Sequence, residues 1–361
     1  MTVIESISTA VPGHRHSQEA LCRFLETHLP MDDRSAALMR RMAEQSAIDA
    51  RFSVLPDFSL LPENWQGLKK TAGGFSAGGI ARRMELYFEH ALPLSLQALA
   101  GLDFHPGEIT HLIAVTCTGI AAPGLDLMLC EALNLRPGTQ RSCIHFMGCY
   151  AAIHALKQAD YICRAQPSAK VLVVCTELCT LHIRADARPD NLASTLLFGD
   201  GSAAVLLTGE SAVQTKSLFR LRNFTSAFLP SGKTQMAWHP DEEGFRMELG
   251  RFVPDLVGNG IGQLLQDALS EAQNRPAGWA IHPGGRKILD RAAEGLSLEK
   301  PAFQSSYDVL RECGNMSSPT VLFVLERELR KMQQAGSSGT VFGAAFGPGL
   351  TMESMLLETL P

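Results

Sequence analysis

The hydrophobic positions alternate between short apolar runs and longer stretches with helical spacing. Nearly continuous apolar runs, of the kind buried on both faces of a sheet, occupy His111–Cys117, Lys170–Glu177 and Gly278–His282. Amphipathic spacing predicts helices over Gln18–Leu29, Ala36–Ser46, Ile80–Leu102, Leu125–Leu133, Leu256–Gln273 and Arg286–Glu294, and another that begins near Pro319. Alternation of buried strands with helices predicts an α/β layered fold.

Proline, glycine and small polar residues divide the rest of the chain. Further strands are expected over Thr2–Pro12, Gly339–Ala345 and Leu350–Leu357, and Ser17 and Ser318 are expected to cap helices. The Leu55–Gly79 region is expected to be irregular and to end in a mobile, glycine-rich surface loop over Ala72–Gly79. Leu197–Leu207 has the pattern of a hairpin.

The strand and helix pattern of the first half is repeated in the second. The two halves are predicted to span residues 1–212 and 213–361. No low-complexity tract or linker separates them, so they are expected to share one core.

Composition excludes several classes of protein. The 361 residues carry a net charge of −5, which argues against a nucleic-acid partner. No apolar stretch approaches the length of a membrane span, and the first residues do not resemble a signal peptide. Nine cysteines without CxxC pairs predict free thiols rather than disulfides or a metal site. These features together predict a cytoplasmic protein without a membrane span.

Cys149 is the first candidate for chemistry. It follows Gly148 and opens a segment in which Ala151, Ala155 and Ala159 form part of a buried helical stripe. A thiol at the first turn of a helix lies near the positive end of the helix dipole, which favours the nucleophilic thiolate. Taken alone, however, a cysteine in such a chain is more often a small buried hydrophobe.

Two further polar residues stand where α/β sheets hold their sites, at the ends of strands or the starts of helices. His282 ends the apolar strand before Pro283, and Asn315 precedes a helix. Alone, a histidine there is usually a satisfied core residue and an asparagine a cap or turn residue. Together with Cys149 they predict a nucleophile whose substrate oxygen is held by an imidazole and an amide.

Six motifs, in order and nearly spanning the chain, carry a family resemblance. They are Gly148-Cys149, Val171–Glu177, Leu197–Gly201, Ile281–Gly285, Gly314–Ser318 and Phe346–Leu350, and the asparagine follows the histidine by 33 positions (315 − 282). With these motifs the chain resembles the type III polyketide synthases of the chalcone and stilbene synthase family. The resemblance implies a thiolase fold with duplicated αβαβα layered halves, and a homodimer.

The resemblance also implies roles for the site. Cys149 matches the acylated nucleophile, His282 its partner, Asn315 the second donor to the thioester oxygen, and Phe198 the gatekeeper where the CoA tunnel meets the cavity. Without the resemblance, Phe198 would be assigned to the core. An acyl-CoA starter would load onto Cys149 and be extended by malonyl-CoA units through decarboxylative Claisen condensation. No metal or redox cofactor is expected, and CoA thioesters are the substrates.

Several substrate-binding positions depart from the plant pattern. Arg41 fits a basic residue near the CoA phosphates, but Leu38 and Gln45 replace its basic neighbours, so the contact could shift to Arg40. In the cavity, the changed positions are Cys117, Cys179 and His182 for threonine, Ala122 for a methionine that crosses the dimer interface, Trp238 for glycine and Met247 for phenylalanine. The remaining residues that the resemblance assigns to substrate binding are Gly284, Gly285, Ser317, Gly347, Pro348 and Gly349.

These replacements suggest a starter. Small groups at Cys117, Ala122 and Cys179 leave space for a slender aliphatic chain, while Trp238 fills the pocket that an aromatic starter would need. The expected substrate is therefore a fatty acyl-CoA and the expected product an alkylresorcinol or alkylpyrone. By crowding the floor on which the ring closes, Trp238 would favour carbon–carbon closure over lactone closure.

From the residues alone, three other functions of the protein remain possible. A 3-ketoacyl-ACP synthase III-like enzyme would also use Cys, His and Asn, but would perform a single condensation with an acidic carrier protein as partner. The Ala345–Gly349 loop and the Gly314–Ser318 motif argue against it. A non-catalytic thiolase-fold partner should lack one of the three residues. A cysteine protease lacks support in the surrounding motifs.

Overall fold

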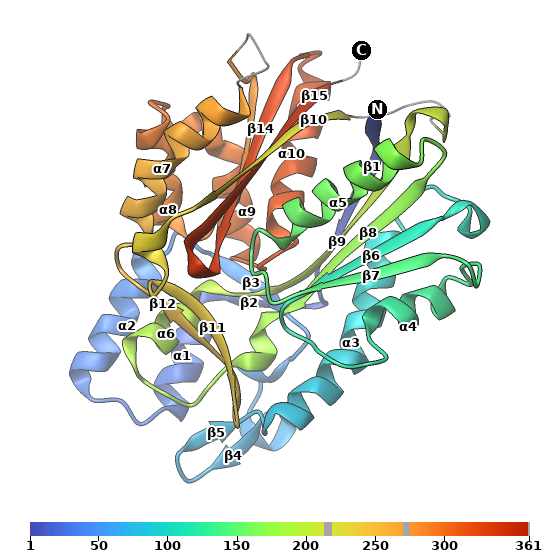
Figure 1. The fold of residues 1–361 in the computed structure, drawn as a ribbon. Coiled ribbons are helices and arrows are strands. Elements are labelled where there is room, and N and C mark those ends of the chain that lie inside the picture. Colours follow the sequence, from blue (N-terminus) through green and yellow to red (C-terminus); the bar gives the residue numbers. More distant parts are fainter. Residues whose placement is uncertain (213–218, 270–274, 360–361) are drawn as a thin grey trace.

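The computed structural model describes residues 1–212, 219–269 and 275–359. In that part of the chain, a nine-stranded sheet has the order β13-β14-β15-β10-β1-β9-β8-β6-β7 (Figure 1). Its strands are β1 (Thr2–Ala10), β6 (His111–Thr116), β7 (Gln140–His145), β8 (Lys170–Leu178), β9 (Asp200–Gly209), β10 (Phe219–Phe228), β13 (Gly278–Ile281), β14 (Thr340–Gly347) and β15 (Thr351–Thr359). Three two-stranded sheets comprise β2 (His14–Ser17) with β3 (Ala50–Ser53), β4 (Lys69–Thr71) with β5 (Gly74–Ser76), and β11 (Met236–Asp241) with β12 (Gly244–Leu249).

The helices are those expected, with two additions. They are α1 (Gln18–His28), α2 (Asp33–Gln45), α3 (Ile80–Leu99), α4 (Leu125–Ala132), α5 (Ala151–Ala165), α6 (Pro189–Leu197), α7 (Val253–Ala268), α8 (Arg286–Gly295), α9 (Gln304–Cys313) and α10 (Thr320–Gln334). Helices α6 and α9 were not predicted. The expected end of α7 at Gln273 and the start of the second half at residue 213 lie outside the described residues.

The large sheet is built from two halves. Strands β1, β9, β8, β6 and β7 form one half, and β10, β15, β14 and β13 form the other. The β6–β7, β6–β8 and β13–β14 pairs are parallel and the other pairs antiparallel. The halves meet at β1 and β10, whose register is limited to Val3↔Arg220 and Ile4↔Phe219.

Helices and sheet halves pack into five layers. Helices α5 and α10 lie between the halves and contact strands of both, within one core cluster that includes Ala155 and Leu325. Helix α3 covers the outer face of the first half, in a cluster with Leu172 and Leu206. Helices α7 and α8 cover the outer face of the second half, in a cluster that includes Phe342. This αβαβα order confirms the predicted layered α/β fold (Figure 1).

Three local predictions were wrong. Leu197–Leu207 is the end of α6 followed by the single strand β9, not a hairpin. Ala72–Gly79, expected to be a loop, contains β5, which pairs with β4. Ser318 does not cap α10, because its hydroxyl donates to Glu177 Oε1 at 2.6 Å instead. The cap predicted at Ser17 is confirmed, since its Oγ accepts from Ala20 N at 3.0 Å.

No helix in the described ranges is both long enough and apolar enough to cross a membrane.

Candidate active site

The three residues singled out by their chemistry meet in one cavity. Cys149, His282 and Asn315 all line a pocket that encloses about 1050 Å³, including its open mouth. They come from the start of α5, the end of β13 and the loop between α9 and α10. Residues from both halves therefore build the site, and neither half holds all three.

Close backbone packing places Cys149. Gly148 adopts a φ of +80°, and a Cβ at this position would collide with the ring of Pro348. Gly347 is equally tight, because a Cβ there would lie 2.6 Å from Tyr150 Cδ1. Helix α5 begins two residues after Cys149, at Ala151. The two glycines thus let the cysteine loop and the Pro348 loop approach each other at the cavity wall.

Hydrogen bonds from Thr320 Oγ1, at 3.5 Å, and from Ser317 N orient the amide of Asn315. Its Oδ1 accepts from Ser317 N at 2.8 Å, which leaves the Nδ2 amino group as a free donor. Nδ2 lies 3.9 Å from Cys149 Sγ. The backbone of Asn315 bonds on both sides of Phe198, since its N donates to Leu197 O at 3.0 Å and its O accepts from Gly199 N at 2.9 Å.

His282 is fully buried and its ring is uncommitted. Its backbone N donates to Ala344 O at 2.8 Å, which continues the β13–β14 pairing by one residue. Neither ring nitrogen has a hydrogen-bond partner among the described residues. A buried imidazole without partners is costly unless a ligand satisfies it, so both nitrogens are available to a substrate.

Burial governs the ionisation of both groups. Desolvation raises the pKa of Cys149 to about 11, although hydrogen bonds from Ser317 and Asn315 oppose the rise. Desolvation also lowers the pKa of His282 to about 3. Burial therefore opposes the thiolate that the position of Cys149 before a helix was expected to favour. A thiolate can arise here only together with a positive partner, and His282 lines the same cavity.

Two buried charged residues support the site, and the sequence analysis assigned neither. Glu177 Oε2 accepts from Cys117 N at 2.9 Å and from Thr118 Oγ1 at 2.7 Å, so the carboxyl group holds the turn after β6. Burial raises the pKa of Glu177. In the sequence, the one sign of this role is that Glu177 lies near the end of a largely apolar strand.

Arg51 is the second of these residues and is 1% exposed. Its Nη1 donates to Thr195 O at 2.8 Å and to Phe198 O at 3.3 Å, and its Nη2 donates to Leu196 O at 2.8 Å. The guanidinium thus holds the carbonyl end of α6 and the backbone of Phe198, whose side chain lines the cavity.

Most of the predicted cavity residues are in the wall. Beside Phe198, the lining includes Cys117, Cys179, His182, Trp238, Met247, Gly284, Ser317 and Pro348. Trp238 Nε1 donates to Cys117 O at 3.0 Å, which fixes the indole beside the small thiol. His182 stacks on Phe245 with ring centroids 4.4 Å apart.

Other expected positions lie elsewhere. Arg41 is exposed on α2 and outside the lining, and Arg40 is 2.5 Å from Glu26 Oε1 in an ion pair, which argues against a shift of the CoA phosphate contact to it. Ala122 is exposed, so within this chain it does not enlarge the cavity. Gly285, Gly347 and Gly349 act through the backbone beside the wall rather than in it.

Among the residues that the structure describes, no group of three histidine, cysteine or acidic side chains is arranged to hold a metal ion. All nine cysteines are free thiols.

The layered fold and a cysteine–histidine–asparagine cavity built from both halves define the class of thiolase-fold condensing enzymes. Within that class, the chain belongs to the chalcone and stilbene synthase family. The family's N-terminal domain matches residues 1–211 and its C-terminal domain matches residues 220–361. The protein is therefore a type III polyketide synthase, an acyltransferase.

Named relatives agree with this assignment. The chain is 33% identical to the alpha-pyrone synthesis polyketide synthase-like Pks18 of Mycobacterium tuberculosis, over all of this chain and 92% of that protein. It is 32% identical to type III polyketide synthase A of Arabidopsis thaliana, over 78% of this chain and 74% of the relative.

Solved structures show the same fold. PKS-I from the brown alga Ectocarpus siliculosus superposes with a TM-score of 0.90 at 26% identity, covering 99% of this chain and 98% of that one. CsyB complexed with CoA-SH superposes with a TM-score of 0.88 at 27% identity, covering both chains completely. These matches confirm the predicted thiolase-like fold.

Proposed function

We propose that the protein loads a fatty acyl-CoA onto Cys149, extends it with several malonyl-CoA units and closes the product to an alkylpyrone or alkylresorcinol. The observation that carries the proposal is the apolar cavity wall, in which Cys117 and Cys179 present small side chains and Trp238 is hydrogen-bonded to Cys117 O. An unbranched alkyl chain fits such an apolar slot better than an aromatic ring.

Loading begins with a neutral cysteine and a neutral histidine. A ring nitrogen of His282 takes the thiol proton as Cys149 Sγ attacks the thioester carbonyl, which gives acyl-cysteine and releases CoA as a thiol. The negative charge on the carbonyl oxygen is met by the Nδ2 amino group of Asn315 and by the imidazolium. The free ring of His282 and the orientation of Asn315 support these roles.

Extension uses the same donors. Malonyl-CoA loses CO2, and the resulting enolate oxygen is held by His282 and Asn315, while the apolar ring of Phe198 disfavours the departing carboxylate. The carbanion attacks the acyl-cysteine carbonyl and the lengthened chain leaves on CoA. Transfer back to Cys149 allows the next cycle.

Ring closure decides between the two products. The relative named for alpha-pyrone synthesis favours closure through oxygen, as a lactone. Trp238, held beside Cys117, narrows the floor of the cavity and favours a folded chain with carbon–carbon closure. Because these indications differ, the experiment below separates the products.

The test is a starter screen with purified protein, malonyl-CoA and acyl-CoAs from acetyl to palmitoyl, with coumaroyl-CoA as the aromatic comparison. Mass spectrometry should find tri- or tetraketide pyrones or resorcinols from medium or long acyl chains. Turnover of coumaroyl-CoA without turnover of any medium or long acyl-CoA would contradict the proposal. A Cys149→Ala protein supplies the control for background condensation.

We also propose a homodimer whose protomers each contain the two halves, 1–212 and 213–361, as one unit. Strand β7 ends the sheet with Gln140–Cys143 exposed, and Ile120 is 46% exposed nearby on the loop after β6. An open edge strand next to an exposed apolar residue suits pairing with a second copy. Sedimentation should give twice the mass of 39.1 kDa, and a monomer would contradict this proposal.

A further inference from the structure

The β11–β12 hairpin supplies one wall of the cavity without belonging to the large sheet. It forms a two-stranded sheet of its own, with Trp238 opposite Met247. Alternate residues on one face of the hairpin line the cavity, namely Met236, Trp238, Phe245, Met247 and Leu249. The position of this small hairpin therefore sets the position of the wall.

A neighbouring wall comes from the segment that runs from the end of β8 into α6. Cys179 and His182 line the cavity from the turn after β8, and Ser194 and Leu197 line it from α6. In the interior, the hairpin meets this segment through weak or uncharged contacts. Phe245 N lies 3.4 Å from His182 Nδ1, and the two side chains stack.

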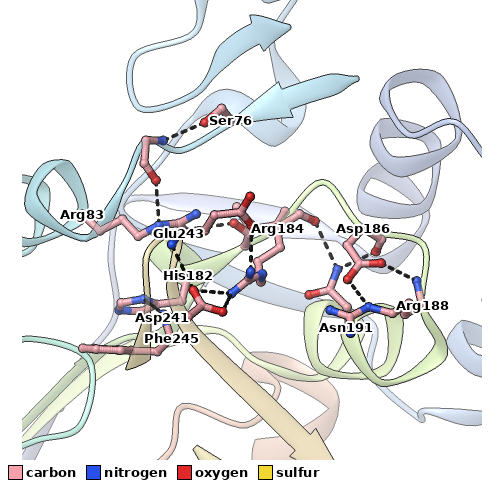
Figure 2. A network of polar contacts seen from close by, with 12 residues as sticks. Ser76, Arg83, His182, Arg184, Asp186, Arg188, Asn191, Asp241, Glu243 and Phe245 are labelled. Carbon is pink, nitrogen blue, oxygen red and sulfur yellow. Dashed lines mark hydrogen bonds and ion pairs between the residues drawn. The ribbon is translucent and has the colours of Figure 1, made fainter. Parts of the chain in front are cut away.

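At the tip of the hairpin the contact is ionic. Arg184 Nη1 lies 3.0 and 2.8 Å from the two carboxylate oxygens of Asp241, and Nη2 lies 2.7 Å from Glu243 Oε2 (Figure 2). The Arg184 side chain is only 11% exposed, so solvent screens these pairs less than it would at an open surface. A planar guanidinium that holds two carboxylates fixes direction as well as distance.

Arg184 is itself anchored to the second wall. Asn191 Nδ2, in α6, donates to Arg184 O at 3.1 Å and to Asp186 O at 2.6 Å (Figure 2). Arg83 completes the attachment, with Nη1 donating to Ile183 O at 3.0 Å. The ion pairs therefore join the tip of one cavity wall to the backbone of the other.

The backbone at the tip of the β11–β12 hairpin is packed closely against Arg83. Gly244 packs on the Arg83 guanidinium, where a Cβ would lie 2.7 Å from Nε, and it has a φ of +129°. Arg83 and Arg184 together face Asp241 and Glu243, so two positive charges meet two negative charges.

We propose that Arg184 is a positioning residue that fixes the width of the acyl cavity by holding the β11–β12 hairpin against the 179–197 segment, and so selects the length of the starter chain. The inference rests on the proposed acyl-CoA function. Arg184 touches no reacting atom, because its side chain lies at the tip of the hairpin and outside the cavity lining.

The first test compares Arg184→Gln, Arg184→Lys and the wild type in the same acyl-CoA ladder. In Arg184→Gln, the KM for the preferred starter should rise about three- to tenfold and the range of accepted chain lengths should broaden. The kcat for decarboxylation of malonyl-CoA alone should stay within about twofold, since the small malonyl group does not need the far wall. Arg184→Lys should restore part of the selectivity because it keeps one charged contact.

Arg246→Gln is the matched control. Arg246 lies on the same hairpin and bonds to Glu248 at 2.7 Å within its own strand, so it does not join the two walls. Its loss should leave KM and chain-length profile unchanged. An Arg184→Gln profile that coincides with those of the wild type and the control would overturn the proposal.

Hydrogen–deuterium exchange over residues 236–249 gives a readout that does not depend on the starter. Exchange there should quicken severalfold in Arg184→Gln but not in Arg246→Gln, and equal exchange in all three proteins would overturn the proposal. If the wild type accepts only aromatic starters, the proposed function fails. The proposal for Arg184 is then judged by exchange and by the size range of the aromatic starters.

Discussion

At the scale of single residues, Asn315 shows how a neighbouring backbone group chooses which end of an amide meets the substrate. Oδ1 and Nδ2 both lie 3.9 Å from Cys149 Sγ, but Oδ1 already accepts from Ser317 N at 2.8 Å, so the amino group is the end left to donate to a substrate oxygen. The chemistry needs this donor, because a developing oxyanion is stabilised by N–H groups and destabilised by a second oxygen.

Asn315→Asp keeps the size and the bond from Ser317 but replaces the donor by a carboxylate oxygen. Decarboxylation of malonyl-CoA should fall by roughly 10²- to 10³-fold in kcat, as for removal of one oxyanion donor. Labelling of Cys149 with iodoacetamide, followed by mass spectrometry, should show that the site is still formed. A loss below about threefold would remove Asn315 from the mechanism.

The partnership of Cys149 and His282 predicts a change in pH dependence. In His282→Gln no base remains to take the thiol proton, and burial, which raises the pKa of Cys149 to about 11, disfavours the thiolate at pH 7. Alkylation of Cys149 should then be far slower than in the wild type at pH 7 and rise about tenfold per pH unit up to pH 10. The rates are read from the mass of the Cys149 peptide.

His239→Gln is the control for that series, because His239 is exposed at the outer face of the hairpin. It should follow the wild-type profile. If His282→Gln follows it too, the imidazole does not generate the nucleophile.

The chemistry of the site could be predicted from residue types, but its support could not. Cys149, His282 and Asn315 stand at ends of elements, where motifs are visible in the sequence. Glu177 and Arg51 act through long-range contacts to backbone groups 60 and 144 or more positions away, which no local pattern encodes. Ser318 looked like a cap for the same reason, since its distant partner was invisible.

At the scale of elements, the end of α6 is held by two buried side chains, Arg51 and Gln18, whose Nε2 donates to Leu196 O at 3.1 Å. The last carbonyls of a helix have no partner within the helix. Here Arg51 bonds to the carbonyls of Thr195 and Leu196, and continues to that of Phe198. These bonds hold the end of α6 and Phe198 together. The backbone bonds of Asn315 to Leu197 and Gly199 add Asn315 to the same unit.

Arg51→Gln leaves Thr195 O and Phe198 O without the Arg51 donor and Leu196 O with Gln18 Nε2 alone. The free energy of unfolding should fall by about 3 kcal/mol, at roughly 1 kcal/mol for each lost bond. Urea denaturation measures the change. Arg311→Gln, on the exposed surface of α9, should cost less than about 0.5 kcal/mol, and equal losses in the two proteins would contradict the role of Arg51.

Strongly periodic elements were predictable and weakly patterned ones were not. The apolar run of His111–Cys117 predicts only a buried strand, and the apolar stripe of α5 predicts only a helix. Strand β7 has four exposed residues, so its sequence lacks the apolar run of a buried strand. Ala72–Gly79 was predicted to be a loop because it is rich in glycine, but one of these glycines, Gly74, lies in β5, where it has a φ of +120° and packs against the backbone of His28.

At the scale of the whole molecule, buried ionisable groups make stability depend on pH. His182 Nε2 lies 2.8 Å from Thr118 O and Nδ1 faces Phe245 N, so the neutral tautomer satisfies both contacts. Burial lowers the pKa of His182 to about 3. Between pH 6.5 and 3 the unfolded chain therefore binds a proton that the folded chain refuses, and stability falls as the pH falls.

His182→Gln tests this contribution. The difference in unfolding free energy between wild type and variant should change by about 1.4 kcal/mol per pH unit between pH 6 and 4, to the disadvantage of the wild type. Urea titrations at several pH values measure it. Asp200, whose pKa burial raises to about 6, has the opposite slope but is common to both proteins, so it cancels. A difference independent of pH would contradict the assignment.

The place of β1 in the middle of the large sheet has a consequence for biosynthesis. This strand leaves the ribosome long before its neighbours β9 and β10, which begin at Asp200 and Phe219. For the time it takes to translate some two hundred codons, a strand whose Val3, Ile4 and Ile7 belong to the buried core has no native partner for either edge. Nascent chains of this enzyme should therefore engage chaperones through Thr2–Ala10, and release them only when the second half begins to emerge.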